Sequence, residues 1–188
     1  MCVLYTAAAV ALAVLVQAWF VHAAETCPCT SNVCETDPRC AICPDSSGHV
    51  TIPWQWVEDQ PNKAIPDSAF KDCDLAGVSM PNNTQVIGVG AFRGCSRLTS
   101  VVIPDSVVEL HDSAFEETGL RSVIIPDNVK SIGTTAFKDC HNMASVVIGT
   151  SVKNISEFAF AYNHKLASLT FKSPSSLERI RQGAFCAY

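Results

Sequence analysis

Residues 101–120 read VVIPDSVVELHDSAFEETGL, and this pattern recurs along most of the chain. Each copy contains an Ala-Phe pair, and successive phenylalanines are 22, 23, 22, 23 and 25 residues apart. These residues are Phe70, Phe92, Phe115, Phe137, Phe160 and Phe185. Five residues before each one stands an aliphatic residue: Ile65, Ile87, Leu110, Ile132, Ile155 and Ile180. A period of this length predicts stacked repeats that bury their apolar faces against one another.

A second pattern, L-x-x-L-x-L, starts five or six residues after each phenylalanine. It spans residues 75–80, 98–103, 120–125, 143–148 and 166–171. Alternating apolar residues predict a short strand in each copy, with every second side chain in the core. Most of these strands are followed by a Pro-Asn or Pro-Asp turn, because proline cannot donate a hydrogen bond to a further rung.

Stacking aligns equivalent residues into three apolar columns. The first contains Val101, Val123, Val146 and Leu169, and the second contains Ile103, Ile125, Ile148 and Phe171. The repeat phenylalanines are expected to form the third column on the opposite side. At about 25 cal/mol per Å² of apolar area, burial of one phenylalanine per coil contributes a few kcal/mol.

The run from Ile103-Pro104-Asp105 to Ala114-Phe115 resembles the BspA-type (Treponema pallidum-type) leucine-rich repeat, as does Phe92-Arg93-Gly94-Cys95-Ser96-Arg97-Leu98. The resemblance covers residues 48–188. It implies a β-rich leucine-rich-repeat solenoid of the α/β repeat class, with parallel strands on the concave face. Such repeats occur in surface proteins of bacteria and in expanded sets in protists and marine algae. The resemblance therefore implies a secreted or surface location, a role in adhesion or recognition, and no known catalysis.

The N-terminal residues predict export. Residues 1–24 carry no charge, and the apolar run ends in Val21-His22-Ala23, which suits signal peptidase. We expect a signal peptide over residues 1–23, with cleavage after Ala24 or a retained signal anchor as alternatives. Residues 24–47 then form a disulfide-rich cap, and its candidate cysteines are Cys27, Cys29, Cys34, Cys40 and Cys43. Their pairing is open, and zinc binding or a redox pair at Cys40-x-x-Cys43 is the alternative.

Three further cysteines, Cys73, Cys95 and Cys140, stand three residues after a repeat phenylalanine. Thr118 and Asn163 occupy the same position in other copies. This exchange predicts a small side chain that bonds backbone groups of a turn. A disulfide between Cys73 and Cys95, on adjacent coils, is a second possibility.

Composition and motif placement argue against several functions. The net charge is −5 and the 13 basic residues are scattered, so no basic stripe for nucleic acid is present. Histidines at 49, 111, 141 and 164 share no repeat position. His111-Asp112-Ser113 are neighbours in sequence, whereas a catalytic triad is assembled from separated segments. We expect no enzyme activity, no cofactor, no metal site and no membrane insertion after signal cleavage.

Two surfaces are candidate binding sites. The outward row of the concave strands contains Ser79, Val102, Ile124, Val147 and Thr170, and its apolar centre is typical of a binding face. The alternative is that β-branched residues simply favour strands. Trp54 and Trp56 lie in an inserted loop before Phe70 and could anchor a ligand, or one of them could pack over the first coil.

Two sequons predict glycosylation in turns or outer segments, at Asn82 and Asn154. The sixth repeat stops at Tyr188 before its strand, which leaves residues 168–171 as an uncapped edge. Either the gene model is truncated or a partner covers this edge, for example end to end. The sequence thus favours an extracellular module that binds a protein or glycan. The alternatives are a ligand-free fragment of a larger surface protein and a cysteine-rich effector or inhibitor.

Overall fold

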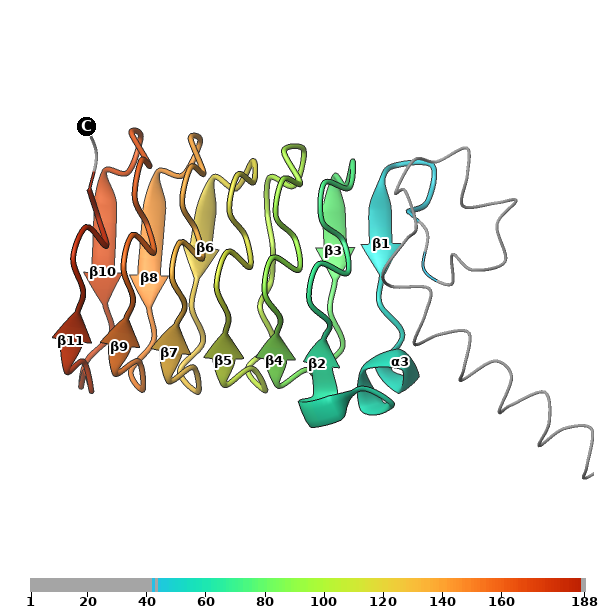
Figure 1. Cartoon of the computed structure of the whole chain (residues 1–188), viewed down its shortest axis with the longest axis horizontal. Coiled ribbons are helices and arrows are strands. Elements are labelled where there is room, and N and C mark those ends of the chain that lie inside the picture. Colours follow the sequence, from blue (N-terminus) through green and yellow to red (C-terminus); the bar gives the residue numbers. More distant parts are fainter. Residues whose placement is uncertain (1–41, 43, 187–188) are drawn as a thin grey trace, which may run out of the picture.

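The computed structural model describes residues 42 and 44–186. They form a solenoid of stacked coils. The strands of the coils make two rows, and the strands of one row point in the opposite direction to those of the other (Figure 1). The signal peptide expected over residues 1–23 and the five cysteines expected to form the cap lie outside the described residues. Within the described part, no helix is long and apolar enough to cross a membrane.

The first row of strands is built from the L-x-x-L-x-L copies. It contains β1 (His49–Thr51), β3 (Gly77–Ser79), β6 (Ser122–Ile124), β8 (Ser145–Ile148) and β10 (Ser168–Phe171). The pairing is parallel: β1 pairs with β3, and β8 lies between β6 and β10 and pairs with both. The register aligns Val123 with Val146 and Val146 with Leu169, which confirms the predicted column. The copy at residues 98–103 forms no strand, contrary to expectation, so the row is divided into two sheets.

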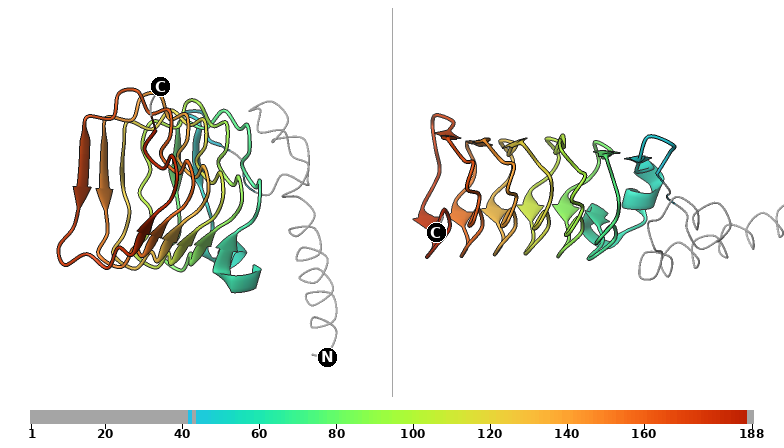
Figure 2. Two further views of the ribbon diagram at one scale, coloured as in Figure 1. Left: turned by 60° about the vertical axis from the view of Figure 1, so that its left-hand side comes forward. Right: turned by 90° about the horizontal axis from the view of Figure 1, so that it is seen from above.

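The second row forms a continuous six-stranded parallel sheet. Its strands are β2 (Ala64–Ile65), β4 (Val86–Ile87), β5 (Glu109–Leu110), β7 (Ser131–Ile132), β9 (Asn154–Ile155) and β11 (Arg179–Ile180). Each strand ends on the aliphatic residue five positions before a repeat phenylalanine, and these residues pair in register. The views in Figure 2 show the row continuing along the whole solenoid.

The Ala-Phe turns form a third side of the solenoid. The backbone N–H of Phe115 donates to Ala136 of the next coil at 2.8 Å, and the N–H of Phe137 donates to Ala159 at 2.7 Å. Inside, the rings of successive phenylalanines stack at centroid distances of 5.1 to 5.3 Å. The third apolar column is thus confirmed, and three backbone hydrogen bonds from each Ala-Phe turn to the next coil keep its rings in register.

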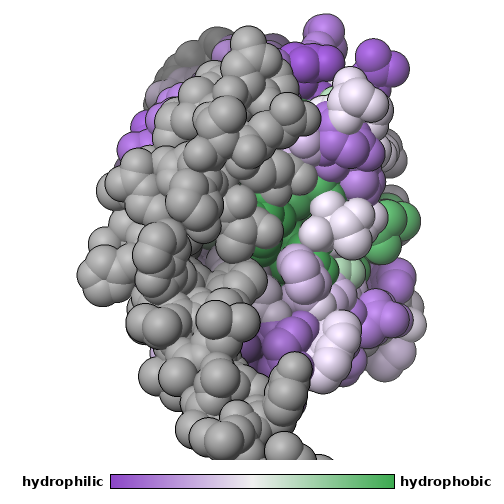
Figure 3. All heavy atoms as spheres, turned by 90° about the vertical axis from the view of Figure 1, so that its right-hand side faces the viewer, coloured by the Kyte–Doolittle hydropathy of each residue, from purple (hydrophilic) through white to green (hydrophobic). Residues whose placement is uncertain are grey.

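The segment before Phe70 is partly helical, whereas a loop was expected. It contains the helix α3 (Trp54–Glu58) and the 3-10 turn η1 (Pro61–Lys63). Trp56 is buried, and its ring centroid lies 6.3 Å from that of Phe70. The helix therefore extends the phenylalanine column by one aromatic ring. The described surface at this end is mainly hydrophilic, with a hydrophobic area among the polar side chains (Figure 3).

Four of the residues that stand three positions after a repeat phenylalanine bond backbone carbonyl groups as predicted. Cys95, Cys140, Thr118 and Asn163 are all buried. Cys95 Sγ donates to the carbonyl of Phe70 at 3.0 Å, and Asn163 Nδ2 donates to Phe137 at 2.9 Å. These bonds connect adjacent coils. Cys73 is disulfide-bonded and Cys95 is free, so the suggested bridge between them does not form.

Candidate functional site

The five residues of the predicted binding row lie on the outward face of the first row of strands, which we call the strand face. Val102 is 81% exposed and Ile124 is 61% exposed, and Val147 is half-buried. Ser79 and Thr170 are also exposed. The register places Ile124 beside Val147 and Val147 beside Thr170. The structure therefore brings together the apolar centre of the row and its hydroxyl-bearing ends.

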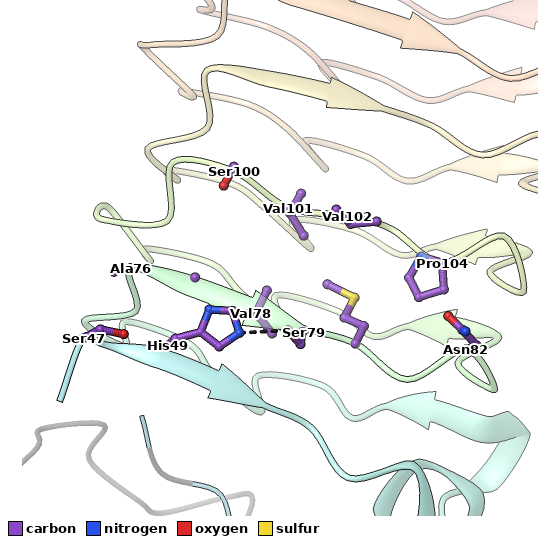
Figure 4. A pocket seen from close by; sticks show the side chains of 12 residues that line it. Ser47, His49, Ala76, Val78, Ser79, Asn82, Ser100, Val101, Val102 and Pro104 are labelled. Carbon is purple, nitrogen blue, oxygen red and sulfur yellow. Dashed lines mark hydrogen bonds between the residues drawn. The ribbon is translucent and has the colours of Figure 1, made fainter. Parts of the chain in front are cut away.

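A hollow of about 510 Å³ opens on the strand face where the row of strands is divided, and we call it the notch. It lies between β3 and residues 100–104, as Figure 4 shows. Val78 and Val101 supply apolar surface, and Ser79 and Ser100 supply hydroxyl groups. His49 Nε2 lies 2.8 Å from Ser79 Oγ, so the imidazole and the hydroxyl share a hydrogen bond at the wall. The volume is within the range of small ligand sites.

The backbone beside the notch is unpaired. Among the described residues, no backbone hydrogen bond is formed by Ser100, Val101, Val102 or Ile103. Nevertheless, Val102 points outward and Ile103 is 5% exposed, so the side chains still alternate as in a strand. Extended backbone with free N–H and C=O groups is the structure that another strand can pair with.

Of residues 42 and 44–186, no aspartate, glutamate, lysine or arginine lines the notch. Because a charge loses solvation when it enters such a site without a partner, an uncharged ligand is favoured. Val102 and Ser79 were predicted from the sequence, whereas the notch was not. The spacing does not mark it, because Leu98 follows its phenylalanine by six residues, but so do Met143 and Leu166, whose copies form β8 and β10.

The two tryptophans of the second candidate site are separated by the fold. Trp54 is 62% exposed, whereas Trp56 is 6% exposed in the core. Trp54 is therefore the tryptophan of this pair that a ligand could contact. Asn83 holds α3 in place, because its Nδ2 donates to Trp54 O at 2.9 Å and to Glu58 Oε2 at 3.0 Å. The hydrogen bond from Asn83, and next the one from Lys63, lower the pKa of Glu58.

The His111-Asp112-Ser113 group is engaged in structural contacts. His111 Nε2 lies 3.2 Å from Glu109 Oε2, and Asp112 Oδ1 accepts the N–H of Thr134 at 2.7 Å. Ser113 Oγ lies 2.8 Å from Thr135 Oγ1. Each side chain thus bonds outside the group, and in two cases the bond leads to the next coil.

Three carboxylates, of Glu116, Glu117 and Asp139, lie within 4.8 Å of one another and could in principle contact a cation. However, Glu116 pairs with Arg93 at 3.3 Å and with Lys138 at 3.4 Å, and Lys138 pairs with Asp139 at 2.8 Å. Calcium takes six to eight oxygen ligands. The cluster is better described as a chain of ion pairs that joins successive coils.

The two sequons lie in different environments. Asn82 is exposed in the turn after β3, at the rim of the notch, as expected. Asn154 is half-buried in β9, an outer segment of its coil that is paired on both sides by β7 and β11. Glycosylation at the two sites stays a prediction.

Comparison with known proteins identifies the family. The BspA-type leucine-rich repeat model matches residues 63–188 in six copies. A leucine-rich cell surface protein of Faecalibacterium prausnitzii is 30% identical over 67% of this chain and 32% of its own, with a TM-score of 0.60. The leucine-rich repeat protein of T. pallidum is 25% identical over 73% of this chain and 72% of its own, with a TM-score of 0.50.

No curated protein matches the chain significantly. The chain spans about a third of the length of the F. prausnitzii protein. The family model covers more than half of the chain, and the repeat phenylalanines and aliphatic residues that define its period build the core. The chain belongs to the BspA-type leucine-rich repeat family.

Proposed function

We propose that this protein is a secreted or cell-surface binding module without enzyme activity, and that it recognises an extracellular protein or glycan through its strand face. One observation carries the proposal: Val102 and Ile124 are 81% and 61% exposed on neighbouring coils, with hydroxyl-bearing residues around them. Solvated apolar side chains at the centre of a polar surface are typical of interaction sites. The similar F. prausnitzii protein is described as a cell surface protein, which supports this location.

The test replaces the apolar centre of the strand face. A variant with Val102→Asp, Ile124→Asp and Val147→Asp is compared with wild type in capture of proteins and glycans from extracellular surface fractions. We expect capture to fall by about tenfold or more, because buried charge without a partner opposes binding. Circular dichroism should be unchanged, since all three side chains point away from the core.

The matched control carries three new carboxylates elsewhere. Gln85→Asp, Ser131→Asp and Asn154→Asp change residues at the second row of strands, with Ser131 and Asn154 adjacent in register. This control should capture the same molecules as wild type. Undiminished capture by the variant with three aspartates on the strand face contradicts the proposal. That result favours the alternative that the chain is a ligand-free fragment of a larger surface protein.

A further inference from the structure

We infer that the notch binds an uncharged, extended peptide segment of a partner protein, which hydrogen-bonds to the free backbone groups of residues 100–103. The inference rests on the proposed function, because it names the partner class for the same strand face. It commits to a peptide because the free groups beside the notch are those of a backbone.

The first step is the unpaired backbone. In a parallel sheet each rung uses N–H and C=O groups of both neighbours. Residues 100–103 have strand-like alternation of their side chains, but their backbone N–H and C=O groups form no hydrogen bond within the described chain. At about 3.3 Å per residue, these four residues present an edge about 13 Å long. Peptides that add a strand to a sheet bind such edges through main-chain hydrogen bonds.

The second step is the space beside this edge. The hollow of about 510 Å³ is lined by this segment, by β3 and by His49 of β1, so a further chain can approach the free backbone groups from the strand face (Figure 4). Val78 and Val101 line it and can contact small apolar side chains of the ligand. Val102 points outward beside them and extends the apolar contact onto the strand face.

The third step is charge. The whole chain contains 31 charged residues, the 13 basic and 18 acidic ones, but none of those in the described part of the chain lines the notch. Of the described lining residues, His49 alone has a titratable side chain, and its Nε2 is bonded to Ser79 Oγ. A neutral segment loses no ionic solvation on entry, whereas a charged one finds no partner. The ligand is therefore an uncharged peptide with small or β-branched side chains.

The test selects peptides on the full chain. A displayed library of seven-residue peptides without Asp, Glu, Lys or Arg is selected against the immobilised protein, and recovered peptides are synthesised and titrated. We expect peptides whose affinity falls by about tenfold when alternate backbone nitrogens are methylated, because each methyl group removes a donor. A selection that yields no peptide, or peptides insensitive to methylation, overturns the inference.

Amide hydrogen exchange locates the contact. In the free protein, amides 100–103 should exchange fast, whereas the amide of Ile125, bonded to Val147 O at 2.8 Å, should be protected. Bound peptide should slow exchange at 100–103 by about tenfold or more and leave Ile125 unchanged. Protection before peptide is added means that this chain or a second copy already covers the notch, and that result also overturns the inference.

A matched pair of variants separates this site from the rest of the strand face. Ser100→Trp fills the notch and should lower peptide affinity by about tenfold. Ser168→Trp changes the equivalent, exposed residue of β10 and should leave affinity unchanged. If Ser100→Trp has no effect on peptide binding while Ile124→Asp with Val147→Asp still abolishes surface capture, the notch inference fails and the proposed function stands. If surface capture is unaffected by those two aspartates, the proposed function fails.

Discussion

The position three residues after each phenylalanine shows how single side chains connect the coils. Cysteine, threonine and asparagine all fit there because each donates to a nearby carbonyl group. Thr118 Oγ1 donates to Phe115 O at 2.9 Å, and Cys140 Sγ reaches the same carbonyl from the next coil at 3.2 Å. Burial raises the pKa of Cys95 to about 12 and that of Cys140 to about 11, which keeps both thiols protonated as donors. The sequence predicted this role because the exchanged residues share size and donor capacity.

Asn163 is the most demanding case, since its Nδ2 donates to Phe137 O at 2.9 Å and to Phe160 O at 3.0 Å. We expect Asn163→Ala to lower the free energy of unfolding by about 1–3 kcal/mol, because buried carbonyl groups lose their donor. Asn163→Cys, which restores the residue found at positions 95 and 140, should cost less because one donor remains. Urea denaturation measures both variants. Equal stability of wild type and Asn163→Ala would show that these bonds add nothing.

At the level of elements, alternation could be predicted from the sequence but backbone pairing could not. Val123 and Val146 are buried and paired as expected, whereas Val102 and Ile103 alternate correctly in a segment without a strand. Side-chain pattern reports which face is inside, but pairing also requires neighbouring backbones to lie about 4.8 Å apart. The six-stranded sheet was not predicted either, because its two-residue strands are too short to show a period. Because side-chain alternation does not show which backbones pair, the notch was not predicted, although its exposed residues were.

The turns after the strands also join coils. Asp127 Oδ1 accepts the N–H of Thr150 at 3.0 Å, and its Oδ2 pairs with Lys172 Nζ at 3.1 Å. The Thr150 N–H, and next Lys172, hold the pKa of Asp127 below its ordinary value of 3.8. Because the folded pKa lies below the unfolded one, this stabilisation is present above the unfolded pKa and is lost as the pH falls through the folded pKa.

We therefore expect Asp127→Asn to be less stable than wild type at neutral pH, with a difference that shrinks below about pH 4. Unfolding free energies measured across this range check the prediction. Asp105 occupies the same turn of the preceding coil, but there only its backbone carbonyl accepts a hydrogen bond, from Asn128 Nδ2 at 2.7 Å, and its carboxylate accepts none within the described chain. Asp105→Asn is therefore the control and should change little. A difference for Asp127→Asn that persists unchanged in acid would contradict the assigned role of its charge.

For the whole molecule, stability is a sum over neighbouring coils, because each coil contacts chiefly the ones beside it. Burial is greatest in the middle and decreases towards β10 and β11. Val146 is fully buried, whereas Leu169, in the same column, is 39% exposed, and Ile180 is 51% exposed. Among the described residues, β10 and β11 are the end strands of their sheets, with no strand on the far side. It follows that equivalent residues should contribute unequally to stability according to their coil.

The phenylalanine column tests this inequality directly. Phe160 is 1% exposed between two rings, whereas Phe185 is half-buried and stacks on Phe160 alone within the described chain. We expect Phe160→Ala to cost about 3–5 kcal/mol, since it leaves a cavity between two coils, and Phe185→Ala to cost less than half of that. Phe160→Ala should also release the coil of β10 and β11, so amide exchange there should rise more than at β4 and β5. Equal losses for the two variants, with uniform exchange along the chain, would mean that the solenoid unfolds as one unit and not coil by coil.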